Sequence, residues 1–96
     1  MSDIGIVISS RAVQFSRFSG RVVEHIENYT VPQYGDAPDD NVESWTAEDC
    51  VRQIEKYAKR FGKNSRPGQD ALDLIKMAHY ACLAHDKLQA NTNGRT

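Results

Sequence analysis

Apolar positions between residues 45 and 61 recur at the three- and four-residue steps of a single helical face. The members of this stripe are Cys50, Val51, Ile54, Tyr57, Ala58 and Phe61. Thr46 can accept from the free N–H groups of the first turn, and Asp49 three residues later resembles the acid of a capping box. Gly62 suits the left-handed residue that follows a helix. The pattern predicts a helix over residues 47–61.

A second apolar pattern follows the short connection 61–68. It begins near Pro67, which is tolerated in a first helical turn because its missing N–H has no helical partner. Its apolar residues are Leu72, Leu74, Ile75, Ala78, Ala81, Cys82, Leu83 and Leu88, and they cover more than half of the circumference. We therefore predict a central helix over 67–88 that contacts two neighbours, followed by a disordered tail over 89–96.

The N-terminal part carries a third, broader stripe. Ser9 or Ser10 can cap a helix over 10–29 whose apolar residues are Ala12, Phe15, Val22, Ile26 and Tyr29. Gly20 lies inside this pattern, and it leaves open whether residues 10–29 form one helix or two elements. Residues 1–9 are expected to form a short extended segment. Residues 31–44, with two prolines and a glycine, are expected to form a polar loop that is either functional or mobile.

These elements predict an all-α fold, a single domain over 1–88 built as a small three-helix bundle with an extended N-terminal segment. A chain of 96 residues buries only roughly 60–65% of its unfolded surface, so we expect a homo-oligomer, most simply a dimer. No apolar run reaches the roughly 18 residues that span a bilayer, and no signal peptide is apparent, which favours the cytoplasm. The net charge of -1 argues against a nucleic-acid partner. The two cysteines, Cys50 and Cys82, are expected to be reduced core residues.

Positive charge gathers around the connection between the two C-terminal helices. The cations are Lys56, Lys59, Arg60, Lys63 and Arg66. The N-terminus of the following helix, with its free N–H groups, would also favour an anion. We predict a phosphate site of Lys56, Arg60, Lys63 and Arg66, with Tyr57 or Tyr34 available to stack on a base. A solvated basic helix end is the alternative. The segment 62–65 is not a P-loop, because it lacks the upstream glycine and the strand.

Two weaker patterns concern metals. Glu24 and Glu27 lie three residues apart on the first helix, as Asp70 and Asp73 do on the last, and opposed carboxylate pairs can hold Mg²⁺. This arrangement resembles the acidic pairs of all-α nucleoside triphosphate pyrophosphohydrolases. The two aspartates are equally explained by their place in the first turns of a helix. The residues His79, Cys82 and His85 turn away from a common face, so we expect core or rim positions rather than a zinc site.

The segments 56–63 and 73–80 resemble a small tailed-phage family. Its members carry a Lys-Tyr, Arg, Gly-Lys turn followed by an Asp-Leu, Lys-Ala, Tyr helix, and here the turn is Lys56-Tyr57, Arg60, Gly62-Lys63. The family is associated with a phage nucleotide kinase, a deoxynucleoside monophosphate kinase without a P-loop. The resemblance covers about the C-terminal half of the chain, and Asn28 stands where the family has His. It implies nucleotide metabolism and points to the same basic residues.

The leading hypothesis is therefore a helical protein that binds a phosphate-containing ligand, such as a nucleotide. One alternative is a non-enzymatic interaction or dimerisation protein, and a further one is a Mg²⁺-dependent pyrophosphohydrolase. The sequence leaves open whether the protein is an enzyme and which ligand it binds. These hypotheses differ in what the structure should show, namely a basic pocket, an uncovered apolar face or converging carboxylates.

Overall fold

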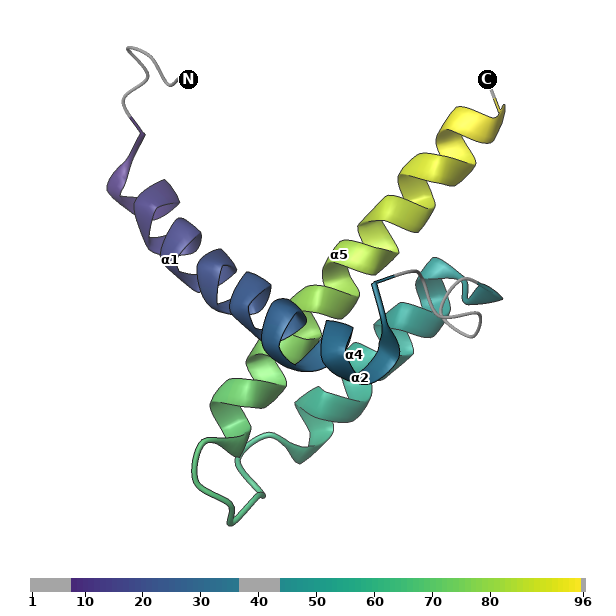
Figure 1. Ribbon diagram of the computed structural model, residues 1–96. Helices are drawn as coiled ribbons and strands as arrows, with labels where there is room; N and C mark the ends of the chain where they lie inside the picture. The colour runs from purple at the N-terminus through teal and green to yellow at the C-terminus, as the bar shows by residue number, and fades with distance from the viewer. Residues whose placement is uncertain (1–7, 37–43, 96) are drawn as a thin grey trace.

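The computed structural model describes residues 8–36 and 44–95, and the regular secondary structure in this part of the chain is entirely helical. Its segments are α1 (Ser10–His25), the π-helical turn η1 (Ile26–Thr30), α2 (Val31–Tyr34), α4 (Ala47–Arg60) and α5 (Gln69–Arg95). The first three follow one another without a break and form one long helix (Figure 1). The described residues contain no strand, and the all-α, three-helix fold is confirmed.

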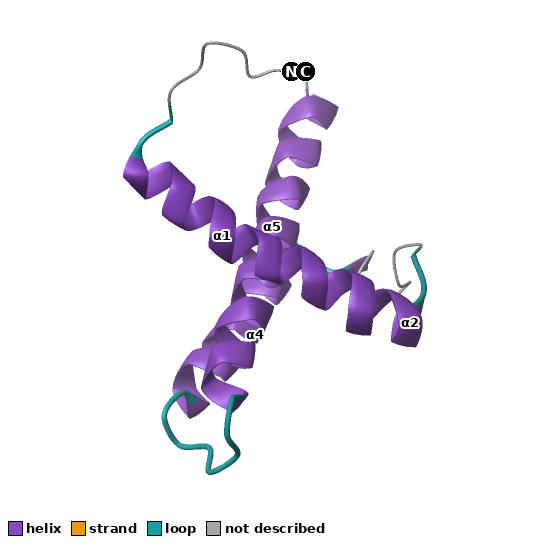
Figure 2. Ribbon diagram, turned by 60° about the vertical axis from the view of Figure 1, so that its left-hand side comes forward, coloured by secondary structure: helices purple, strands orange, loops and turns teal. Residues whose placement is uncertain are grey.

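The helices α4 and α5 pack side by side as an antiparallel hairpin, and the long N-terminal helix crosses α5 (Figures 1 and 2). Beyond the crossing, the N-terminal half of α1 and the C-terminal half of α5 diverge like the arms of a V. The prediction that the last helix contacts two neighbours is thus confirmed. None of the described helices is both long and apolar enough to cross a membrane.

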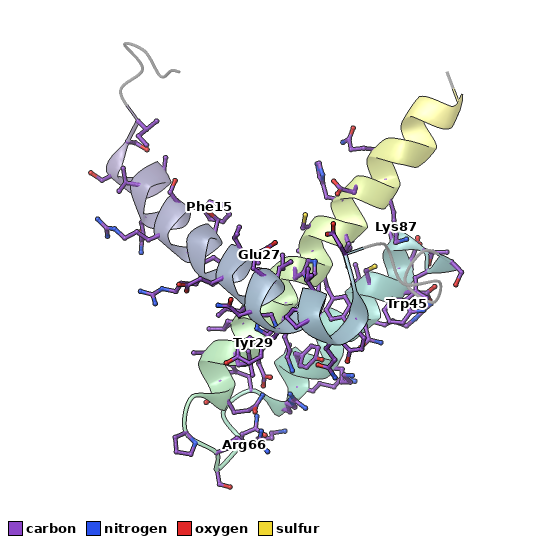
Figure 3. All side chains as sticks on the ribbon, viewed as in Figure 1. Phe15, Glu27, Tyr29, Trp45, Arg66 and Lys87 are labelled. Carbon is purple, nitrogen blue, oxygen red and sulfur yellow. The ribbon has the colours of Figure 1, made fainter. Side chains whose placement is uncertain are left out.

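The core lies between α4 and α5. Ala47, Cys50 and Ala84 are its buried members, and Trp45, Tyr80 and Leu83 pack against them. Trp45, labelled in Figure 3, stacks on Tyr80 with 6.2 Å between ring centroids. Cys50 is completely buried, as expected, whereas Cys82 is exposed, so the prediction of a core cysteine at 82 is wrong.

The helix ends follow the local sequence signals closely. Ser9 Oγ accepts from the Ala12 N–H at 3.1 Å, which caps α1. Thr46 and Asp49 form the predicted reciprocal capping box, at 3.1 and 2.9 Å. Gly62 adopts φ +80° directly after α4, a conformation that a residue with a Cβ adopts only with strain. Gly20 does not interrupt α1.

The first helix continues past its predicted end because it contains a π-helical turn. An α-helix through Pro32 would lose a hydrogen bond and would press the ring against the carbonyl of Asn28. In η1 the turn is widened instead, and Val31 N–H donates to the Ile26 carbonyl. The helix then ends at Gly35, whose φ is +90°. The polar loop predicted over 31–44 is therefore helical at 31–34, and 37–43 lie outside the described residues.

The last helix differs from its prediction at both ends. It begins at Gln69 rather than at Pro67, which lies in the preceding turn, and it ends at Arg95 rather than near residue 88. The expected disordered tail is therefore helical over 89–95. The extended segment predicted for 1–9 falls mostly on residues 1–7, outside the described part of the chain.

Candidate anion-binding site

The basic residues of α4 share one face of the helix, because they follow one another at steps of three or four residues. They line an open depression of about 580 Å³, which we call the α4 groove. Its lining residues are Arg52, Glu55, Lys56, Lys59, Arg60 and Lys63. Three of the predicted site residues, Lys56, Arg60 and Lys63, therefore line the groove. It also contains Arg52, Glu55 and Lys59.

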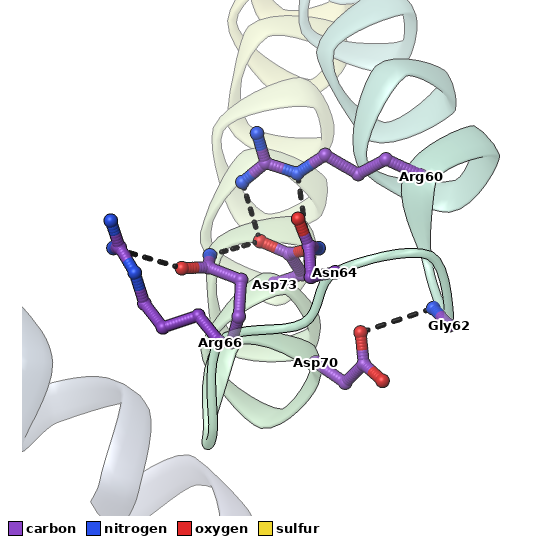
Figure 4. A network of polar contacts seen from close by, with 7 residues as sticks. Arg60, Gly62, Asn64, Arg66, Asp70 and Asp73 are labelled. Carbon is purple, nitrogen blue, oxygen red and sulfur yellow. Dashed lines mark hydrogen bonds and ion pairs between the residues drawn. The ribbon is translucent and has the colours of Figure 1, made fainter.

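Arg60 is held in place by a buried carboxylate from α5 (Figure 4). Its Nη2 donates to Asp73 Oδ1 at 2.7 Å and its Nε donates to Asp73 Oδ2 at 3.2 Å. Gln69 and Asn64 also donate to this carboxylate, at 2.9 and 3.3 Å. These bonds, those from Arg60 foremost, hold the pKa of Asp73 below its usual value, although Asp73 has no exposed surface.

Two of the three guanidinium nitrogens of Arg60 therefore donate to Asp73, and its side chain remains 41% exposed. The same residue lines the α4 groove. A guanidinium held along one edge by a carboxylate needs little further ordering to bind a ligand at its outer edge. Its charge, however, is largely balanced by Asp73, so the lysines must supply most of the attraction for an anion.

Tyr57 lies beneath the cations and not beside them. The Arg60 guanidinium carbon lies 4.8 Å from the centre of its ring, and the Lys56 and Lys76 amines lie at 4.9 and 5.5 Å. The ring is buried and stacks on Tyr80, with 6.1 Å between centroids. The expectation that Tyr57 stacks on a base is therefore wrong, because its faces are already covered. Its role is to support the cations through their attraction to the ring.

The remaining predicted residues lie outside the groove. Arg66 donates to Gln69 Oε1 at 3.4 Å and is not part of the lining. Tyr34 is exposed on α2, and its hydroxyl contributes to the raised pKa of Tyr80, for which burial is the main cause. At the start of α5, Asp70 accepts from the Gly62 N–H at 3.0 Å. The first turn of α5 thus carries its own acid, and the predicted anion position at that terminus is not supported.

The carboxylates proposed for Mg²⁺ do not form a site. Within residues 8–36 and 44–95, no three His, Cys, Asp or Glu side chains gather closely enough to hold a metal. Asp73 is occupied by Arg60, and Glu24 and Glu27 are exposed on the first helix (Figure 3 labels Glu27). The four carboxylates on which the pyrophosphohydrolase hypothesis depends therefore do not gather into one group in the described part of the chain. His79, Cys82 and His85 do not gather into such a group either, and Cys82 is exposed.

One further cluster was missed by the sequence reasoning. Where α1 crosses α5, His25 lies near Lys76 and His79, and burial together with these positive neighbours lowers the pKa of both histidines. His25 also stacks on Tyr29, labelled in Figure 3, with 5.3 Å between ring centroids. Only the three-residue spacing of Lys76 and His79 could have indicated that they share a face.

The residues that carry the phage-family resemblance contact one another across the hairpin. Tyr57 stacks on Tyr80, Arg60 pairs with Asp73, and Lys76 lies over the Tyr57 ring. The motif thus includes the contacts that join α4 to α5. Comparison of the chain with models of protein families, with curated proteins and with solved structures gave no match.

Proposed function

We propose that this protein binds a phosphate-containing small molecule in the α4 groove. The observation that carries the proposal concerns the charge partners of three lysine side chains in this groove. Within the described residues, Lys56, Lys59 and Lys63 form no ion pair, although they line one depression of about 580 Å³. The only carboxylate in that lining is Glu55. Like charges in one groove repel one another, and a phosphate would offset that repulsion.

The other two cations of the groove have defined partners. Arg52 pairs with Asp49 at 2.6 Å, and Arg60 pairs with Asp73. The groove therefore keeps a positive excess in a chain whose net charge is -1. An open, lysine-lined groove fits an exposed phosphate group, and no ring in its lining is available to hold a base. The phage-family resemblance supports a nucleoside monophosphate as the first ligand to test.

The test is thermal unfolding of the full chain with deoxynucleoside monophosphates, inorganic phosphate or the matching nucleosides. A ligand at ten times its Kd stabilises the folded state by about 1.4 kcal/mol. For a domain of this size that corresponds to a rise in Tm of about 6–11 °C. We expect a rise with the phosphate compounds, none with the nucleosides, and a smaller rise at high salt.

A charge-matched pair of variants locates the site. K56Q/K59Q/K63Q removes three positive charges from the α4 groove, and R11Q/R17Q/R21Q removes three from exposed positions of α1. The first variant should lose the ligand-induced rise and the second should keep it. An equal loss in both would mean that only overall charge attracts the anion. No rise in the unaltered protein at 10 mM ligand would refute the proposal for these ligands.

A further inference from the structure

The apolar stripe of α1 is only partly used within one chain. Its C-terminal part meets α5 at the crossing, whereas its N-terminal part projects beyond the crossing (Figures 1 and 2). No residue of α1 is buried. Phe15 is 65% exposed and Ile8 is 54% exposed, and the centroid of the Phe15 ring lies 6.2 Å from that of Phe18. A hydrophobic stripe of this kind normally faces another element.

The total exposed surface leaves room for an interface with a second copy. The chain exposes 7490 Å², whereas a compact folded chain of 10.8 kDa exposes about 5,500 Å². Its radius of gyration is 15.7 Å, against about 12.5 Å for a compact chain of this length. A stable homodimer buries about 800–1,000 Å² of each partner. Roughly half of the excess surface would therefore be enough for a dimer interface.

We propose that α1, whose N-terminal half is exposed, pairs with α1 of a second copy of this chain. Phe15 and Val22 lie seven residues apart on α1, the period that keeps one face of a helix against another helix, and Phe18 lies between them. Ile8 precedes the helix, which is capped by Ser9. One patch meeting its own copy about a twofold axis is the commonest way to close a dimer. This inference is independent of the α4 groove, which lies on another helix.

The charges of the helix favour an antiparallel pair. Arg11 and Arg17 lie in the N-terminal half of α1, and Glu24 lies in its last turn. Two parallel copies would bring the arginines together. An antiparallel pair whose axis lies near Phe18 places Arg11 of each helix near Glu24 of the other.

Sedimentation velocity of the full chain across a dilution series tests the dimer. We expect the mass of two chains at high concentration, dissociating on dilution. F15E should raise the dimer Kd at least about 30-fold, the effect of losing a central aromatic anchor. Y34E is the matched control, because Tyr34 is 63% exposed on the same long helix but lies far from the proposed axis, and its Kd should not change.

Circular dichroism should show equal helix content in both variants, and F15A replaces F15E if the latter does not fold. A monomer at all concentrations up to 100 µM overturns the proposal, and so does a dimer that F15E leaves intact. Cysteine cross-linking in a C82S background tests the orientation. S19C should form a disulfide-linked dimer near the axis, whereas R11C should not. A cross-link through R11C would refute the antiparallel arrangement.

Discussion

Asp73 offers the sharpest test of how the hairpin is held together. Its carboxylate has no exposed surface and accepts four hydrogen bonds, from Arg60 twice, from Gln69 and from Asn64. D73N keeps the size of the side chain but replaces one acceptor oxygen with an NH₂ group. If the amide oxygen takes the Oδ1 position, Arg60 Nε and Asn64 Nδ2 then face a donor. Two hydrogen bonds are lost and their donors remain without an acceptor.

The expected cost follows from that count. A hydrogen bond to a charged group contributes about 1.5 kcal/mol, and a donor left without a partner adds to the loss. Arg60 is 41% exposed and can turn to water, which places the total at about 2–3 kcal/mol. That is a large part of the 5–15 kcal/mol typical of a domain, and it corresponds to a fall in Tm of about 8–24 °C.

Urea unfolding of D73N and D86N measures the difference. Asp86 is exposed on the same helix, so its replacement should change the free energy of unfolding by less than about 0.5 kcal/mol. The pH dependence gives a second readout. Because the pKa of Asp73 is lower in the folded state, its stabilisation is present above about pH 4 and is lost as pH falls through the lowered value. D73N should lack this part of the acid sensitivity. Equal stability of D73N and the unaltered protein would refute the structural role of the carboxylate.

Three smaller predictions follow from other positions. G20A should stabilise the protein by about 0.5–1 kcal/mol in thermal unfolding, because a Cβ there meets open space on a continuous helix, and a destabilisation would contradict a regular α1. A thiol reagent should modify the exposed Cys82 quickly. It should modify Cys50 only on unfolding, because Cys50 is buried and burial raises the pKa of its thiol. Equal rates for the two cysteines would contradict the burial of Cys50 in the core. The lowered pKa of His79 means that the unfolded chain binds more protons, so stability should fall as pH drops below about 6.5, and H79Q should reduce that slope in Tm measurements. An unchanged slope would exclude His79 as the cause.

The helix ends that depend on neighbouring residues could be predicted from the sequence. The Thr46 and Asp49 capping box, the Ser9 cap and the left-handed Gly62 all act within a few residues of themselves, and they mark the bounds of α1 and α4 well. The end of α5 could not be predicted in this way. It continues through polar residues that carry no stop signal before Gly94, and the apolar pattern alone suggested a tail.

The site was harder to predict, because its chemistry depends on contacts between helices. Periodicity shows that Lys56 and Arg60 share a face, but it does not show that a carboxylate thirteen residues later binds Arg60. Likewise, periodicity does not show that Tyr80 stacks on Tyr57 and covers its ring. The lysines lie where the helix face places them. The pairing of the arginine and the burial of the ring are set by the second helix.

The π-helical turn at residues 26–30 also determines where the end of the first helix points. Successive residues of an α-helix are rotated by about 100° around its axis. Deleting one residue of this turn, to restore α-helical hydrogen bonding, would therefore rotate α2 by about that angle against α1. Tyr34 would then leave the vicinity of Tyr80, and Pro32 would again meet the backbone of the preceding turn. The extra residue thus fixes the rotation of α2 relative to α1. The length of this segment therefore matters for the structure as much as its composition does.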